Sequence, residues 1–170
     1  FGVADPATLS FLDPPPAPAL AEARSLLRDL DAVDEAGRLT EAGEAMRRLA
    51  LPARLAHMVA EASRSGQALD AARLAVLLTE RGLSGSDTDL ERRLARFLAD
   101  RSPRASAARQ LAERLARQVA RHPHDQDSRS AAGPLLLHAW PDRVAKARGE
   151  RGRFLLANGS GAMLDAADPL

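Results

Sequence analysis

The side chains best suited to chemistry in this sequence are the basic residues of its second part, and the chemistry that they suit is the binding of phosphate groups. Residues 101–170 carry 12 Lys or Arg against 7 acidic residues, whereas residues 1–100 carry 12 Arg against 16 acidic residues. Arg114, Arg117 and Arg121 recur at three- and four-residue spacing, which places their guanidinium groups on one face of a helix. Such a face matches the repeated negative charges of a nucleic-acid backbone. A solvated helix surface is the simpler alternative for the same pattern.

Motifs for catalysis or metal binding are missing from the sequence. The chain has no cysteine, and its single lysine, Lys146, does not follow the paired glycines of a phosphate-binding loop. His122, His124, Asp125 and Asp127 lie close together but have no second ligand cluster at zinc-site spacing, so we interpret them as a solvated loop. We therefore expect no catalytic residue, no metal site and no cofactor within these residues.

The elements that must position the basic residues are mostly helices. Aromatic residues make up 3% of the chain while Ala, Leu and Arg predominate, which is a helix-forming composition with an aliphatic core. Pro141 is expected to kink or split the last helix. Apolar residues at three- and four-residue spacing, together with capping signals, predict helices over 18–30, 40–49, 53–63, 68–80, 104–121 and 133–148, and two more that begin at Asp5 and Ser86.

Short extended segments interrupt this helical pattern. Residues 32–34 and 37–40 flank a turn and predict a small two-stranded ribbon, which with the helices on either side makes a degenerate winged-helix unit. Residues 154–157 and 162–164 flank an Asn-Gly dipeptide, which tolerates the positive φ of tight turns, and predict a β-hairpin. The expected fold is mainly α: a degenerate winged-helix unit, an antiparallel helical bundle and a short β-hairpin at the C-terminus.

The composition also bears on where the protein acts. No apolar run approaches the roughly 20 residues of a membrane span, and the N-terminus lacks a signal-peptide pattern. The absence of cysteine fits a reducing compartment, so we expect a cytoplasmic protein with no membrane partner. Because the chain starts at Phe1 and reaches Leu170 just after a strand-like segment, we expect a piece of a longer polypeptide.

Several spaced segments together resemble a known family, the DEAH-box ATP-dependent helicases, and most closely their HrpB-type branch. The segments are Phe11-Leu12-Asp13-Pro14-Pro15-Pro16, Gly37-Arg38-Leu39-Thr40-Glu41-Ala42-Gly43, Arg54-Leu55-Ala56-His57-Met58, Trp140-Pro141-Asp142-Arg143-Val144-Ala145, Arg148-Gly149 and Leu156-Ala157-Asn158-Gly159. One departure is Ala53, which stands where the family usually has a second proline. This departure concerns the start of the local helix and leaves the resemblance intact.

The resemblance implies four parts: a linker over 1–16, a degenerate winged helix over 17–50, a ratchet-like helical bundle over 51–148 and the start of a β-containing domain over 149–170. It also implies two RecA-like motor domains in the same parent chain, which would bind ATP and Mg²⁺ and make that chain a nucleoside-triphosphate hydrolase. In such helicases the bundle packs beside the motor domains and helps to line the channel for a single strand. The family favours RNA over DNA.

We predict that basic residues of the positively charged part contact the phosphates of single-stranded nucleic acid. These residues are Arg109, Arg114, Arg117, Arg121, Arg143, Lys146 and Arg148. Two alternatives remain. One is a stand-alone winged-helix DNA-binding regulator, although its recognition helix over 41–49 carries two acidic residues and two arginines. The other is a purely structural brace whose apolar faces dock onto the motor domains.

Overall fold

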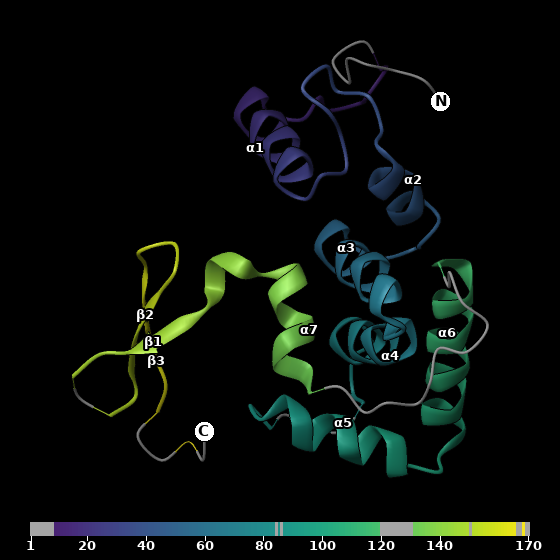
Figure 1. Cartoon of the computed structure of the whole chain (residues 1–170), viewed down its shortest axis with the longest axis vertical. Coiled ribbons are helices and arrows are strands. Elements are labelled where there is room, and N and C mark those ends of the chain that lie inside the picture. The colour runs from purple at the N-terminus through teal and green to yellow at the C-terminus, as the bar shows by residue number, and fades with distance from the viewer. Residues whose placement is uncertain are drawn as a thin grey trace.

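The computed structural model of the chain describes residues 9–83, 85, 87–119, 131–149, 151–165 and 168. Helices surround a central helix, Ala68–Thr79, and a small antiparallel sheet lies at one side (Figure 1). The elements are α1 (Ala17–Asp29), α2 (Glu41–Arg47), α3 (Ala53–Ala62), η2 (Ser63–Ser65), α4 (Ala68–Thr79), α5 (Leu90–Ala99), α6 (Pro103–Val119), α7 (Ala132–Ala139), η3 (Pro141–Arg143), β1 (Ala145–Ala147), β2 (Arg153–Leu156) and β3 (Gly161–Met163). The predicted mainly α fold with C-terminal antiparallel strands is confirmed.

The N-terminal unit joins α1, a minimal ribbon and α2. Val33 and Leu39 form one antiparallel bridge. Among the described residues, this bridge stands in place of the predicted two-stranded ribbon. The Thr40 hydroxyl caps α2 by accepting a hydrogen bond from the Gly43 N–H at 3.0 Å. Helix α1 contributes no buried residue. The assignment of this unit as a degenerate winged helix stays a prediction.

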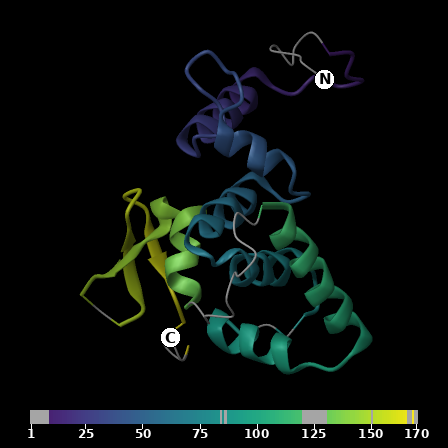
Figure 2. The same ribbon diagram turned by 45° about the vertical axis from the view of Figure 1, so that its right-hand side comes forward.

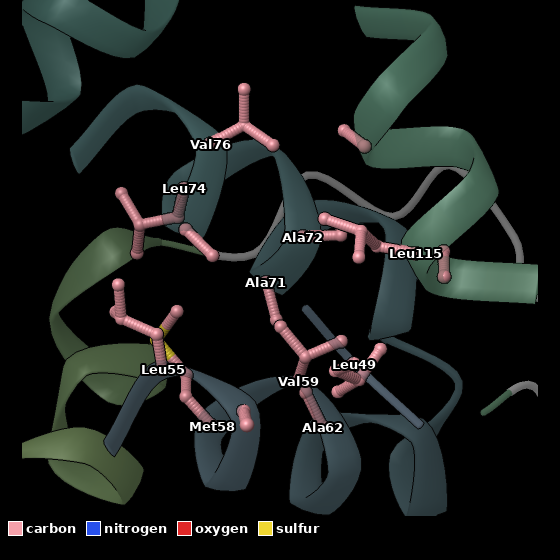
Figure 3. Close-up of a cluster of buried hydrophobic side chains, with 14 of the residues drawn as sticks. Leu49, Leu55, Met58, Val59, Ala62, Ala71, Ala72, Leu74, Val76 and Leu115 are labelled. Atoms are coloured by element: carbon pink, nitrogen blue, oxygen red, sulfur yellow. The ribbon is translucent and has the colours of Figure 1, made fainter. Parts of the chain in front are cut away.

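The core lies between α3, α4 and α6 (Figure 3). Helix α4 is buried on most sides, as its nearly continuous apolar sequence predicts, and Leu74 and Leu77 are at most 1% exposed. Met58 and Val59 of α3 pack in the same cluster and are fully buried. Small side chains let α4 and α6 lie close together, and among the described elements this pair is in the most extensive contact. The buried alanines are Ala68, Ala71, Ala72 and Ala75 on α4 and Ala105, Ala108, Ala112 and Ala116 on α6.

Helices α5 and α7 complete the bundle. The Asp89 carboxylate caps α5 by accepting hydrogen bonds from the N–H groups of Glu91 and Arg92. The start predicted at Ser86 is therefore wrong, because Asp89 satisfies the free N–H groups and the helix begins at Leu90. Helix α7 packs against α3 (Figure 1).

The helix expected to continue to Arg148 ends at Ala139, and this prediction is wrong for the residues beyond it. The turn η3 and the strand β1 follow instead, because the ring of Pro141 cannot continue a helix. Strand β1 pairs antiparallel with β2, which pairs antiparallel with β3. The predicted hairpin is confirmed as β2 and β3, whereas β1 is an additional strand. Lys146 accordingly lies on a strand and not in a helix.

Burial separates the sheet from the helical part. Among the residues described between 145 and 168, none is buried, so the sheet has no core of its own. The domain limits at residues 16, 50 and 148 stay predictions. The start of the helix predicted from Asp5 to about Leu12 falls outside the described residues, and residues 9–12 are not helical, so the prediction is wrong for them. Within the part of the chain that the structure describes, no helix is both long enough and apolar enough to span a membrane.

Candidate nucleic-acid interface

The outer side of α6 carries the two described members of the predicted arginine stripe. Arg114 borders an open groove between α6 and the end of α4, next to Glu80 and Arg104. The guanidinium of Arg117 lies 3.9 Å from the carboxylate of Glu113, and 68% of the Arg117 side chain is exposed. An ion pair this long and this exposed contributes little to stability, so it does not hold Arg117 away from a phosphate.

Arg109, by contrast, joins α6 to the end of α5. Its Nη1 donates hydrogen bonds to the carbonyl oxygens of Phe97, at 2.9 Å, and Asp100, at 2.7 Å. The guanidinium also lies 6.0 Å from the centre of the Phe97 ring. A cation is favourable here because the last carbonyls of a helix lack partners within the helix. Since the protein backbone already binds this guanidinium, Arg109 is not available to a phosphate in this conformation.

The Asp100 carboxylate shares this corner between α5 and α6. It accepts a hydrogen bond from the Ser102 N–H at 2.8 Å. This bond, followed by a weaker contribution from the Ser102 side chain and the charge of Arg109, holds the pKa of Asp100 below its ordinary value. The corner is thus fixed by local bonds on both sides.

The end of the predicted stripe and the histidine-containing segment lie outside the described residues. They comprise Arg121, His122, His124, Asp125 and Asp127. The phosphate contact predicted for Arg121 and the interpretation of the segment as a solvated loop both stay predictions. In the described ranges, no group of three or more His, Cys, Asp or Glu residues is placed to hold a metal ion.

The second group of predicted residues follows η3 and β1. The Arg143 guanidinium lies 6.0 Å from the centre of the Trp140 ring. Lys146 and Arg148 are separated by one residue of an extended segment, so they point to the same face of the sheet. The register of β1 with β2 places Arg153 opposite Arg148 on that face, and the Arg148 N–H donates to the Arg153 carbonyl at 2.9 Å.

The structure does not bring the two groups together. Helix α6 lies on one side of the bundle and the sheet on the other, with α3, α4 and α7 between them (Figures 1 and 2). We call Arg114 and Arg117 the α6 surface, and Arg143, Lys146 and Arg148 the sheet surface. Each surface is exposed to solvent, and each would contact a different stretch of a bound polyanion.

Two residues beside the sheet surface were not singled out from the sequence as binding residues. Arg153 lies on the same face, and the half-buried Trp140 lines a groove together with Arg143. The signal that would have found this face is the alternation of apolar or basic residues with alanine over 144–148, which has the period of a strand. The high helix propensity of alanine concealed it.

Comparisons with known proteins find similarity both in sequence and in structure. No family model matches the chain. It is 38% identical, over 170 residues, to the ATP-dependent RNA helicase HrpB of Escherichia coli (strain K12), a match that covers 100% of this chain and 20% of that protein. Two crystal structures of E. coli HrpB, described as a DExH-box NTPase and as a DEAH/RHA helicase, match 99% of the chain at 35% identity, with TM-scores of 0.77 and 0.75. The chain covers 20% of each of these structures.

The matches in sequence and in fold agree with each other. Both extend over essentially the whole chain, and both lead to the same relative. The chain spans about one fifth of the length of the proteins that it matches. The chain is therefore similar, along its whole length, to one segment of an HrpB-type DEAH-box helicase.

Proposed function

We propose that this chain is an accessory part of an ATP-dependent RNA helicase and that it holds single-stranded nucleic acid by its phosphates. The observation that carries the proposal is the likeness, along the whole chain, to a protein named as an ATP-dependent RNA helicase. ATP, Mg²⁺ and the RecA-like motor domains would belong to the rest of the parent chain. RNA is the preferred nucleic acid because the relative is an RNA helicase by name.

The exposed basic residues support the gripping role. A guanidinium group binds phosphate through two parallel N–H bonds, and three of the four arginines on the two surfaces extend into solvent without a close ion pair among the described residues. Contacts of this kind hold the backbone and carry no base sequence. They suit a helicase part that must hold a strand of any sequence.

Bracing of the motor domains is a second candidate function, favoured by a different observation. Three large apolar side chains lie exposed before α1: Leu9 is 43%, Phe11 is 47% and Leu12 is 99% exposed. Apolar residues that gather on a surface mark contacts with another protein surface. Because these residues are far from both basic surfaces, bracing and gripping are compatible (Figure 1).

A stand-alone winged-helix regulator receives less support. Its recognition helix would be α2, which has seven residues and whose Arg47 is paired with Glu44 at 2.9 Å. The wing would be the single bridge between Val33 and Leu39. A helix that enters the major groove needs free side chains for base edges, and α2 offers few of them.

The test is the binding of a fluorescein-labelled single-stranded RNA, followed by anisotropy over a series of salt concentrations with duplex DNA as competitor. We expect binding that weakens with salt and prefers the single strand. The slope of the logarithm of the binding constant against the logarithm of the salt concentration measures the number of phosphate contacts. The double substitution of Arg114→Ala and Arg117→Ala should make this slope shallower by about 0.7 per lost contact. The matched control replaces Arg38 and Arg47, two exposed arginines of the N-terminal unit, and should leave the slope unchanged.

Three results would count against the proposal. Equal slopes for the two double variants would remove the α6 surface from the interface. Preference for duplex DNA would favour the regulator, and absence of salt-dependent binding would favour the brace.

A further inference from the structure

An apolar groove lies where the end of α7 meets the start of β1. It has a volume of about 420 Å³, and Trp140 and Arg143 line it together with leucines of α4, α5 and α7. The volume falls in the range of about 300–1,000 Å³ that is typical of small-molecule sites. The groove is thus large enough for a flat aromatic group.

The walls of this groove are apolar residues that remain open to solvent. Leu78 is 36%, Leu137 is 49% and Val144 is 48% exposed, and all three line the same groove. Single exposed apolar residues are ordinary on protein surfaces, but a cluster around one hollow marks a binding site. Among the described residues that line the groove, none is acidic.

The groove opens onto the sheet surface. The Val144 carbonyl accepts a hydrogen bond from the Ala157 N–H at 2.8 Å, which continues the ladder between β1 and β2. Side chains alternate along a strand, so Val144, Lys146 and Arg148 lie on one face, about 6.6 Å apart from one to the next. This row of side chains therefore runs from the apolar wall of the groove to two cations. The distance between the two cations suits successive phosphates of an extended strand.

We infer that the groove binds a nucleobase of the single strand against the indole of Trp140, while Arg143, Lys146 and Arg148 bind the neighbouring phosphates. The inference rests on the proposed function and adds a base-binding site to it. The occupant follows from the combination of one indole, an apolar hollow and an adjoining row of cations, because nucleic acid pairs flat apolar bases with regularly spaced negative charges. Stacking on an aromatic ring accepts every base, so this site also holds a strand of any sequence.

The intrinsic fluorescence of the chain provides a direct test, because Trp140 is the only tryptophan and the chain has no tyrosine. We expect titration with an unlabelled oligoadenylate to quench the Trp140 emission to a saturating level. Inorganic polyphosphate, which carries the charges without the bases, should compete for the cations without that quenching. In the control variant Leu12→Trp with Trp140→Phe, the tryptophan stands at a 99% exposed position before α1, and the same oligonucleotide should leave its emission unchanged.

Affinity measurements separate stacking from packing. Trp140→Leu keeps an apolar side chain in the groove but removes the aromatic face, and it should weaken RNA binding about fivefold or more in the anisotropy assay. Trp140→Phe retains a stacking face and should stay within about twofold of the unchanged chain. Helical circular dichroism checks that both variants fold.

The outcomes distinguish this inference from the proposed function. Anisotropy that reports RNA binding while the Trp140 emission stays constant would overturn the base site and leave the proposed function standing. Equal quenching by polyphosphate, or equal affinities of the leucine and phenylalanine variants, would also overturn it. Absence of RNA binding in the anisotropy assay would overturn both proposals.

Discussion

Gly43 lies where the backbone of α2 meets the residues that follow α1. A Cβ atom at this position would stand 2.0 Å from the Ala32 carbonyl oxygen, a distance that no packing adjustment of side chains can relieve. We therefore expect Gly43→Ala to lower the free energy of unfolding by about 1–3 kcal/mol or more, because α2 and the backbone of Ala32 must move apart. Urea unfolding followed by circular dichroism measures the change.

Gly133 provides the matched control for that substitution. It lies in the first turn of α7, and a Cβ atom there would meet nothing within 4 Å. Gly133→Ala should raise the free energy of unfolding by about 0.5–1 kcal/mol, since alanine has the higher helix propensity. Similar effects of the two substitutions would show that close approach at Gly43 is not the cause.

Asp34 gives a prediction for the pH dependence of stability. The Arg38 N–H and then the Arg38 side chain donate to its carboxylate, at 2.9 and 2.8 Å, and they hold the pKa of Asp34 below its ordinary value. The stabilisation by this pair is therefore present above the unfolded-state pKa and is lost as the pH falls through the folded-state pKa. NMR titration of the Asp34 carboxyl should show the lowered pKa.

Arg38→Ala tests the origin of that shift. The substitution removes the side-chain bond and leaves the backbone bond, so the pKa of Asp34 should rise only part of the way towards its ordinary value. A complete return would mean that the backbone N–H of residue 38 has no effect on the pKa of Asp34, and would contradict its role as the main cause of the shift.

At the scale of elements, α6 carries arginines with two different tasks. Arg109 ties the end of α5, whereas Arg114 faces solvent beside the groove at the end of α4. Arg109→Ala should lower the free energy of unfolding by about 1–3 kcal/mol and leave the salt dependence of RNA binding unchanged. Arg114→Ala should leave the free energy of unfolding unchanged and flatten the salt dependence of RNA binding. Paired urea and anisotropy measurements decide, and a flattened salt slope for Arg109→Ala would return that residue to the interface.

Helices and strands were predicted correctly from the sequence where residues close together in the chain determine them. Helix α4 followed from its apolar run, and the turn of β2 and β3 followed from the Asn-Gly dipeptide. Strand β1 was not predicted, because Ala-Lys-Ala favours a helix and its extended conformation depends on pairing with β2. The role of Arg109 was equally hidden, since the carbonyls that it binds belong to another helix.

At the scale of the whole molecule, the sheet and the helical part differ in how they are stabilised. No described residue after Val144 is buried, and the bond from Thr88 to Asp168, at 2.7 Å, is exposed. A chain that ends after residue 144 should therefore keep its helical circular dichroism and stay within about 1 kcal/mol of the original unfolding free energy. The same truncation removes Lys146 and Arg148 of the sheet surface and should abolish their contribution to RNA binding. Loss of the cooperative helical transition would contradict this assignment.

The arrangement of the candidate site was the part that the sequence could not predict. The seven basic residues lie close together along the chain, but α7 and the central helices separate α6 from the sheet (Figure 1). The sequence shows which part of the chain is rich in basic residues, whereas tertiary packing decides which of these residues share a surface. The exposed members of this set that the structure describes therefore form two smaller surfaces with different neighbours.

The alanine-rich packing of the core has a thermodynamic consequence. Alanine supplies half of the buried hydrophobic residues among those described, so the core buries less apolar area per residue than one built from leucine and phenylalanine. Exposure of apolar area sets the heat-capacity change of unfolding, which is about 12–15 cal/mol/K per residue in ordinary domains. Calorimetry should give a lower value here. The stability of this chain would then vary slowly with temperature, with a broad maximum in place of a sharp one.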